Sequence, residues 1–489
     1  FHRDACGNEI HRVFPHDLKL TQRFDAMNRL LGQQVSGRGA SLMDRTYMRD
    51  DSGAITRITE PSVGLDIRYD YDPAEQLVRV LHGPNGPDGS HGAARVEHLA
   101  YDACGNLTSR LRSGDATPST GAGDGAGQVW QYAPGDRLVH ASETDYEHDA
   151  EGRLIRKVER GHASGPQVWG YEWDAFNQLR AVNRPDGQRW TYAYDAFGRR
   201  VTKTGPTGTR RFIYDARMPV HEGEGLTSEW TTWIYADDQY TPVARLGEGS
   251  FVAVFSDQVG MPAAQVAPQD LSVTRFRGDS FGRMQPGCQM PLRMMGQYAD
   301  DESGLHYNMF RYYDPGIGMY ICPDPAGLRG GYNVYQYGLN PVNWVDPLGL
   351  CRRGNQATQN HMDRVRDQFL AENPGFELVS GGRDPTTGRQ ISEHYLPPLT
   401  PGTGRSGSSF VDMRFENPTT GEVVHVQTVD AQATGPCGMS QREWDNANRI
   451  SRQETATRVV TVNKGATPPP GSLNIAHMPA AGPGVVIVR

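Results

Sequence analysis

The 489-residue sequence contains no run of 18 or more apolar residues, which excludes an ordinary transmembrane helix. It is also poor in cysteine. The cysteines are scattered without a CxxC pair or metal-ligand spacing, which favours reduced thiols: Cys6, Cys104, Cys288, Cys322, Cys351 and Cys437. No signal peptide is visible and Phe1 opens in the middle of a pattern, so we interpret residue 1 as an internal point of a longer natural chain.

Glycine and proline, by contrast, are abundant, with 57 and 33 residues. They stand at regular intervals between short strand-like runs, a pattern that predicts many β-hairpins. The chain is longer than one hydrophobic core usually supports, so we expect more than one folding unit. Residues 351–489 contain 14 Lys and Arg and 13 Asp and Glu, a net charge of +1, so residues 1–350 carry −9 of the total of −8. This acidity is weak evidence against nucleic-acid binding by the first part.

A repeated motif runs through the first 300 residues. It consists of an aromatic residue or His, then Asp-Ala, and Gly or Asn three residues after the Asp. Copies occupy residues 24–30, 101–107, 148–154, 173–179 and 194–200, and Tyr214-Asp215 begins a degenerate copy. Such regular spacing indicates a repeat architecture.

Each repeat reads as a hairpin. The alternation in Arg153–Val158 predicts a strand with one apolar face. The Asp can bond to its own backbone, and the Gly or Asn tolerates positive φ. The aromatic residue before the Asp should pack on the neighbouring repeat. Stacked hairpins bury a continuous face, so we interpret these aspartates as turn residues and assign none of them to catalysis.

This pattern resembles the tyrosine-aspartate (YD) repeats of rearrangement-hotspot (Rhs) proteins and of insecticidal toxin-complex C proteins, over about residues 1–350. The resemblance implies an all-β cocoon formed by a spiralling antiparallel sheet. We therefore predict a repeat shell at 1–297, a plug with an autoprotease motif at 298–350 and a C-terminal toxin domain at 351–489.

Two Asp-Pro-x-Gly-Leu boxes follow the repeats, with Asp324 and Asp346 at their first positions, 22 residues apart. Proline restricts the preceding Asp to extended conformations, and the Gly permits a turn, so each box presents a carboxylate at a rigid bend. Two carboxylates brought close do not ionise together easily, which suits one as base and the other as acid around a water molecule.

The resemblance implies the same chemistry, because in Rhs-type proteins this doublet is an aspartyl autoprotease that cuts after the second box. The scissile bond would then be Leu350–Cys351. Arg311 is predicted to orient one of the carboxylates. The alternative is that both boxes are only turns that plug the shell.

Residues 351–489 predict a compact α/β or α+β unit. The expected order is α-β-β-β-β-α-β. The expected helices are Thr358–Glu372 and Ser440–Arg452, and the expected strands are Phe376–Ser380, Ser392–Leu396, Phe410–Phe415, Val423–Val429 and Arg458–Val462.

A candidate toxin site falls on these strands. Asp412 lies within one strand, with Val411 and Met413 expected on its opposite face. His425 and Gln427 share one face of the next strand, and Glu393 lies on the preceding one. A carboxylate facing polar residues can hold Mg²⁺, with Asp412 and Gln427 as ligands.

The arrangement resembles the restriction-endonuclease-like nuclease fold, although the predicted unit has one strand more than that core. The family pattern is Asp followed by Glu-x-Lys, and Asp412 matches its first position. His425-Val426-Gln427 falls at the second position without Glu or Lys, so Asp363, Glu372 or Glu393 could supply the missing carboxylate.

Two alternatives stay open. The toxin domain could be an NAD-consuming enzyme, either an ADP-ribosyltransferase or an NAD hydrolase. The whole chain could also be a non-enzymatic repeat protein or adhesin. A nucleic-acid deaminase is disfavoured, because neither His-x-Glu nor Pro-Cys-x-x-Cys is complete in this chain.

The resemblance also implies a setting. We expect a protein made in the bacterial cytoplasm, secreted by a delivery component such as a type VI secretion spike, and delivered into target cells in interbacterial competition. Its toxin would act on DNA as a Mg²⁺-dependent nuclease, would be masked by a cognate immunity protein, and would not insert stably into a membrane.

Overall fold

The fold is described from a computed structural model. The structure describes residues 1–4, 8–50, 52–83, 95–112, 130–215, 217–225, 230–247, 249–327, 331, 333–338, 340–350, 356–381, 394–396, 409–429, 447–448, 450–452, 457–463, 468–478 and 485–488. The chain divides into two compact units, one made of Phe1–Phe24 and Leu30–Arg353 and the other of Asp25–Arg29 and Gly354–Arg489. No helix in the described part of the chain is long and apolar enough to span a bilayer.

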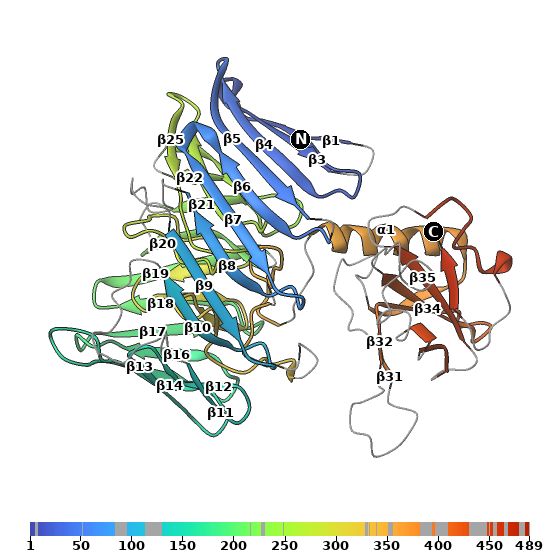
Figure 1. The fold of residues 1–489 in the computed structure, drawn as a ribbon. Coiled ribbons are helices and arrows are strands. Elements are labelled where there is room, and N and C mark those ends of the chain that lie inside the picture. The colour runs from blue at the N-terminus through green and yellow to red at the C-terminus, as the bar shows by residue number, and fades with distance from the viewer. Residues whose placement is uncertain are drawn as a thin grey trace. The chain divides into compact units, whose positions relative to one another are not determined.

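Two large antiparallel sheets build most of the first unit, and in each sheet the strands pair in sequence order (Figure 1). The first sheet contains β1 (His2–Arg3), β2 (Glu9–Val13), β3 (Lys19–Phe24), β4 (Leu30–Gly37), β5 (Ala40–Arg49), β6 (Ile55–Glu60), β7 (Leu65–Tyr71), β8 (Leu77–His82), β9 (Arg95–Tyr101) and β10 (Leu107–Arg112). Short 3-10 turns lie at Pro15–Asp17 and Pro61–Val63.

The second sheet is longer. It contains β11 (Gln131–Ala133), β12 (Arg137–Ala141), β13 (Thr144–His148), β14 (Leu154–Glu159), β15 (Gln167–Trp173), β16 (Leu179–Asn183), β17 (Arg189–Tyr194), β18 (Arg200–Gly205), β19 (Gly208–Asp215), β20 (Met218–Glu224), β21 (Thr231–Tyr235), β22 (Pro242–Gly247), β23 (Ser250–Ser256), β24 (Pro262–Ala267) and β25 (Ser272–Arg275).

The repeated Asp forms the hairpin turn as predicted. Asp174 Oδ1 accepts hydrogen bonds from the backbone N–H of Phe176 at 2.8 Å and of Gln178 at 2.9 Å. Asn177, three residues after the Asp, has φ +61°, which is why Gly or Asn occupies this position. The aromatic residue before the Asp reaches the neighbouring hairpin, as in Tyr194, whose hydroxyl donates to Leu179 O at 2.7 Å.

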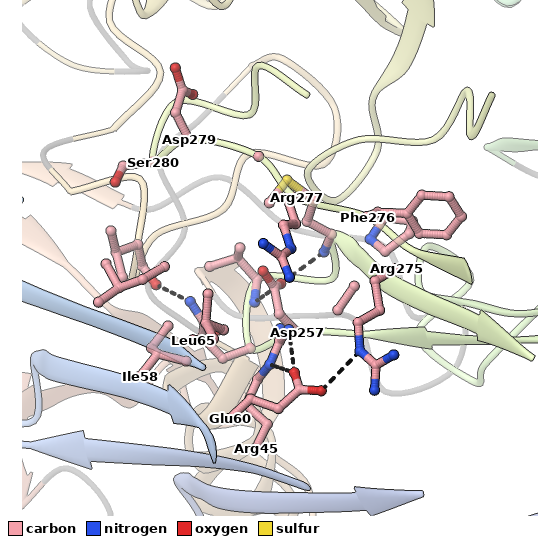
Figure 2. Close-up of a pocket in the computed structure, with 18 of the residues that line it drawn as sticks. Arg45, Ile58, Glu60, Leu65, Asp257, Arg275, Phe276, Arg277, Asp279 and Ser280 are labelled. Atoms are coloured by element: carbon pink, nitrogen blue, oxygen red, sulfur yellow. Dashed lines mark hydrogen bonds and ion pairs between the residues drawn. The ribbon is translucent and has the colours of Figure 1, made fainter. Parts of the chain in front are cut away.

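The end of the second sheet packs against the beginning of the first. Val35 and Met43 share an apolar cluster with Phe255 and Val266. A buried ion-pair network continues this seam, in which Glu60 accepts from Arg45 at 3.1 Å and from Arg275 at 3.3 Å (Figure 2). The seam therefore joins β5 and β6 to β25.

A small antiparallel sheet, which we call the plug sheet, follows. It consists of β26 (Tyr298–Asp300), β27 (Leu305–Asn308), β28 (Arg311–Asp314) and β29 (Met319–Tyr320), and its residues are buried. The plug sheet is bonded to the wall through Arg200, which lies 1% exposed and pairs with Asp300. Tyr298, Tyr307 and Tyr312 of this sheet belong to the same core as the inner faces of both large sheets, whereas Tyr313 and Tyr320 form a smaller cluster with Tyr337.

The second unit contains a mixed five-stranded sheet of order β30-β33-β34-β35-β36. Its elements are α1 (Gln356–Glu372), β30 (Glu377–Gly381), β31 (His394–Leu396), β32 (Ser409–Val411), β33 (Met413–Glu416), β34 (Val423–Val429), β35 (Thr457–Asn463), a 3-10 turn (Ile475–His477) and β36 (Val485–Val488). The first three strands are antiparallel, and β34, β35 and β36 are parallel.

Helical segments cover both faces of this sheet. Phe369 of α1 stacks on Phe415 at 4.1 Å between ring centroids. On the other face, Ala447 and Ile450, which are helical, pack against Val411 and Val459. The unit is therefore a three-layer α/β arrangement.

Two expectations for this unit need correction, one strand was not predicted, and one predicted helix lies largely outside the described residues. The predicted strand Phe410–Phe415 is broken at Asp412, and its halves, β32 and β33, belong to different sheets. Val411 and Met413 consequently lie in different apolar clusters rather than on one face. β36 was not predicted as a strand, and of the predicted helix Ser440–Arg452 the structure describes only residues 447–448 and 450–452.

Candidate active site

Both Asp-Pro-x-Gly boxes form the predicted turns. The N–H of Gly327 donates to Asp324 O at 2.8 Å, and that of Gly349 donates to Asp346 O at 3.4 Å. Gly327 and Gly349 have φ values of +59° and +69°, a region that glycine enters without strain. Each turn holds its aspartate at a fixed place.

The two turns place both carboxylates beside the same guanidinium nitrogen, Nη2 of Arg311. Arg311 Nη2 lies 3.1 Å from Asp324 Oδ2 and 3.1 Å from Asp346 Oδ2. The three side chains are 1–4% exposed. One guanidinium thus compensates two buried carboxylates, and a guanidinium is the cation best suited to several simultaneous hydrogen bonds.

The same guanidinium holds the chain just before the predicted scissile bond. Arg311 Nε donates to Gly349 O, and Nη1 donates to Val334 O at 3.0 Å. The backbone N–H of Leu350 donates to Asp346 Oδ1 at 3.1 Å. The last described residue before Cys351 is therefore bonded directly to one of the paired acids, and Cys351 itself lies outside the described residues.

Tyr320 and Asn308 complete this site, and the sequence did not single them out. Tyr320 OH donates to Asp346 Oδ2 at 2.9 Å, and its ring lies 3.6 Å from the Arg311 guanidinium carbon. Asn308 Nδ2 donates to both Tyr320 OH and Asp346 O at 2.8 Å. Burial raises the pKa of Tyr320 well above its ordinary value, so its phenol stays a hydrogen-bond donor.

Cys322 lies two residues before Asp324 and is fully buried. Burial raises the pKa of its thiol to about 11, so it stays protonated at neutral pH. The buried groups at this site thus offer carboxylates for acid–base chemistry rather than a thiolate nucleophile. Two carboxylates flanking one cation beside a peptide segment can activate a water molecule for hydrolysis.

The candidate toxin residues are only partly brought together. Asp412 Oδ2 accepts from the N–H of Thr428 at 2.7 Å and from its hydroxyl at 2.8 Å, and these bonds hold the bend between β32 and β33. Gln427 Oε1 accepts from the Asp412 N–H at 3.4 Å. His425 is fully buried two residues earlier in β34, and Glu393 lies outside the described residues.

The other carboxylates considered for this site have local roles. Glu372 accepts from the N–H groups of Gly471 and Leu473 at 2.7 and 2.8 Å, and Asp363 pairs with Arg366 at 2.9 Å. Among the described residues, no group of three or more His, Cys, Asp or Glu could hold a metal ion. A Mg²⁺ ion here would depend on Asp412 as its one described carboxylate, which suffices only if substrate phosphate supplies further ligands.

Comparison with known proteins places the first unit. Residues 8–337 match the family model described as the Teneurin YD-shell. The crystal structure of TcdB2-TccC3-TEV superposes with a TM-score of 0.55 at 20% identity, covering 71% of this chain and 19% of that chain. This likeness concerns the fold alone, and it confirms the predicted all-β shell.

The names of the curated relatives refer to different enzymatic activities. The chain is 32% identical over 378 residues to "Probable deoxyribonuclease RhsA" of Dickeya dadantii (strain 3937), covering 71% of this chain and 24% of the relative. It is also 32% identical over 400 residues to "Double-stranded DNA deaminase toxin A" of Burkholderia cenocepacia (strain H111), covering 72% and 26%. The chain spans about a quarter of the length of these relatives.

Proposed function

The chain belongs to the Teneurin YD-shell family, and from that premise we propose that it is part of a secreted Rhs-type effector that frees its own toxin domain. In this proposal the shell encloses the payload, Asp324 and Asp346 cut the chain after Leu350, and the payload acts on nucleic acid in a target cell. The names of the relatives, a probable deoxyribonuclease and a DNA deaminase toxin, support the general role, because these proteins align with this chain over 71% and 72% of its length.

One observation carries the release step: two buried carboxylates share Arg311 Nη2, and one of them accepts a hydrogen bond from the Leu350 N–H. In the reaction, water adds across the Leu350–Cys351 peptide bond. One carboxylate takes a proton from the water, and the other gives a proton to the leaving amide nitrogen. Leu350 keeps the new carboxyl group, and Cys351 keeps the new amino group.

Arg311 has two roles in this reaction. Its bonds to both carboxylates keep them together in spite of their charges, and its bond to Gly349 O fixes the segment that is cut. Such fixed placement of the reacting groups is a large part of the rate gain in intramolecular reactions.

The test of release uses the full chain. We expect the wild type to separate into two fragments with a boundary after Leu350, and Asp346→Asn and Asp324→Asn to stay intact, as measured by intact-mass spectrometry. Asp301→Asn is the matched control, because Asp301 is an exposed acid of the same region. Cleavage of either dyad variant at the wild-type rate would reject the mechanism.

For the payload we propose a nuclease that acts on DNA. The α1, β30, β33, β34, β35 order, with Asp412 at the bend before β33 and Gln427 opposite it in β34, supports the predicted restriction-endonuclease-like arrangement. We also propose Mg²⁺ as its cofactor, bound through Asp412. The ion would supply charge stabilisation at the transferred phosphate.

Expression of Cys351–Arg489 in a bacterium tests the payload. We expect loss of chromosomal DNA, abolished by Asp412→Ala and kept by Asp363→Ala, whose carboxylate pairs with Arg366 away from the bend. EDTA should stop DNA cleavage by the purified domain. Intact nucleic acids with a fall in NAD would favour an NAD-consuming enzyme, and no toxicity together with an uncut full chain would favour a repeat protein without enzymatic activity.

The remaining parts of the proposal concern the setting. We propose synthesis in a bacterial cytoplasm, export through a secretion-system component, and a cognate immunity protein that covers the payload's active face. Co-expression of a neighbouring open reading frame that restores growth to cells producing Cys351–Arg489 is the expected sign of that partner.

A further inference from the structure

The two Asp-Pro boxes are attached to different parts of the wall. The first box, which carries Asp324, rests on the turn between β13 and β14. Gly152 O in that turn accepts from Tyr335 OH at 2.7 Å, and a Cβ on Gly152 would lie 3.2 Å from Pro323 Cγ. The Asp324 N–H donates to Val334 O at 2.9 Å, which ties this acid to the same anchored segment.

The second box is held by both large sheets. Asn343 Oδ1 accepts from the N–H of Ile55, the first residue of β6, at 3.3 Å. Gln258 lies in the turn between β23 and β24, and its Nε2 donates to Val342 O at 3.1 Å. The segment that leads into Asp346 therefore bridges the first sheet and the end of the second sheet.

These two anchors lie on opposite sides of the seam. Ile55 begins β6, and Glu60 at the end of β6 pairs with Arg275 of β25 at 3.3 Å. Arg275 Nη2 also donates to Leu42 O of β5 at 2.6 Å. Gln258 lines the seam cavity together with Glu60 and Arg275 (Figure 2). The joining of the two sheets thus sets the distance between the anchors of the second box.

The meeting of the two acids depends on these attachments. Asp324 and Asp346 share Arg311 Nη2 while each box keeps its place on the wall. An open seam would leave Ile55 and Gln258 on separate sheet edges, so the second box would lose one of its anchors. A displacement of about 1 Å between reacting groups lowers a rate by on the order of 100-fold.

We propose that Gln258 and Asn343 are positioning residues for the cleavage after Leu350, and that through them cleavage waits until the seam has closed. The inference rests on the proposed release function. Both residues act through the segment that carries Asp346 rather than on the reacting atoms. A chain whose wall is still open therefore stays intact, and its payload is freed only inside a closed shell.

The first test follows cleavage during cell-free synthesis of the full chain. Gln258→Met removes the donor to Val342 O at similar side-chain volume, and Asn343→Leu removes the acceptor for the Ile55 N–H. We expect the fragment that ends at Leu350 to appear at least about tenfold more slowly in each variant than in the wild type.

The seam itself is tested by Arg275→Met, which removes bonds between β25 and β5–β6 and lies outside both boxes. It should slow cleavage at least about tenfold as well. Val182→Ala is the control, because Val182 is buried in β16 and pairs with Tyr171 and Trp190 within the second sheet. This variant should cleave at the wild-type rate even if its Tm is lower than that of Arg275→Met.

A pH measurement separates positioning from a general loss of stability. In Gln258→Glu the introduced carboxyl group donates to Val342 O only when it is protonated. The cleavage rate of purified, uncut Gln258→Glu, divided by that of Gln258→Met, should rise at least about threefold as the pH falls toward the ordinary glutamate pKa of about 4.3. The other titratable and charged groups of the seam cavity are common to both variants and cancel in this ratio: Arg45, Glu60, His82, Asp257, Arg275, Arg277 and Asp279.

The outcomes distinguish this inference from the release function. Wild-type rates in Gln258→Met and Arg275→Met, with Asp346→Asn uncut, would overturn the inference and leave the release function standing. Equal slowing in Val182→Ala would also overturn it. A wild type that is never cut after Leu350 would overturn both. If Arg275→Met does not fold, the ratio for the two Gln258 variants decides, and a ratio that stays constant with pH rejects the positioning role.

Discussion

Arg311 donates to two carboxylates and two carbonyl oxygens while lying 2% exposed. Its guanidinium is the cation that Asp324 and Asp346 share, so its removal would take away the positive charge placed between the two buried carboxylates. Substitution by Lys would keep the charge and lose the fork geometry on which the four contacts rest.

Tyr320 offers a residue-scale prediction. Tyr320→Phe removes the phenol that donates to Asp346 Oδ2, and we expect the rate of chain cleavage to fall by about 10- to 100-fold. The rate should fall because Asp346 loses the phenol that holds one of its carboxylate oxygens in place. Cleavage rates across pH 4–8 provide the measurement.

Tyr335→Phe is the matched control for this change. Tyr335 is also buried in the first unit, but its hydroxyl donates to Gly152 O in the wall. An equal fall in the cleavage rate of both variants would show that Tyr320 acts only through general packing.

Site residues that belong to a sequence motif could be predicted from the sequence, and site residues outside any motif could not. Asp324, Asp346 and Arg311 stand in recognisable runs, and the structure places them together. Tyr320 and Asn308 reach the site only through the pairing of β27, β28 and β29, which spacing along the chain does not express. Thr428, the partner of Asp412, was missed for the same reason.

Among the elements, the turn from Arg293 to Gln297 lies in close contact with the second Asp-Pro box. Gly296 has φ +86°, and a Cβ there would overlap Pro347 O. We expect Gly296→Ala to displace the second Asp-Pro box and to slow cleavage by about 100-fold, since shifts near 1 Å in reacting groups have effects of this size. Time courses of fragment release measure this.

Gly287 provides the comparison. It has a similar φ of +77°, but a Cβ there would meet nothing within 4 Å. Gly287→Ala should cost about 1 kcal/mol of stability through backbone strain and leave the cleavage rate unchanged. Equal loss of cleavage in both alanine variants would contradict the role given to the Pro347 contact.

The repeat turns were the most predictable elements, because each depends on one Asp and one residue of positive φ. Some turns of this kind were nevertheless missed, such as that of Asp72, where Glu75 takes φ +64° in place of Gly or Asn. The break at Asp412 was unpredictable from alternation, because it arises from bonds to Thr428 on a neighbouring strand. β36 was missed because Val485–Val488 pairs with β35 in a parallel register that only the folded chain defines.

The whole shell depends on its seam, where Asp257 lies beside Arg45, Glu60 and Arg275 (Figure 2). Burial raises the pKa of Asp257 to about 6, an effect that Arg45 and two backbone N–H groups only partly offset. The folded state therefore binds this proton more tightly than the unfolded chain does. The contribution to stability is greatest below about pH 4 and is lost as the pH rises through 6.

Asp257→Asn should remove this pH dependence while keeping the acceptor for Val259 N and Met261 N. We expect the variant to equal or exceed wild-type stability at pH 7.5, by up to about 3 kcal/mol for a pKa raised from 3.8 to about 6, and to gain nothing at pH 4. Urea unfolding of the shell at both pH values gives the comparison. Asp270→Asn should not show this pattern, because Asp270 is exposed and hydrogen bonds from Ser272 lower its pKa.

The shell as a whole could be predicted from the sequence, because a short motif repeated many times specifies one architecture. The seam could not, because Glu60 and Arg275 lie 215 residues apart and neither belongs to a motif. The chemistry of the second unit was also beyond prediction, because the expected Glu-x-Lys is absent and the relatives' names point to different reactions.

The order of the strands has one further consequence. In both large sheets, every described strand between the two edge strands pairs with the strand made just before it and the one made just after it. Each new strand of such a sheet can pair with the strand before it as the chain leaves the ribosome. This pairing does not require residues that lie far away in the sequence. The seam can close once Arg275 has been made, so the wall can be complete before residues 351–489 follow.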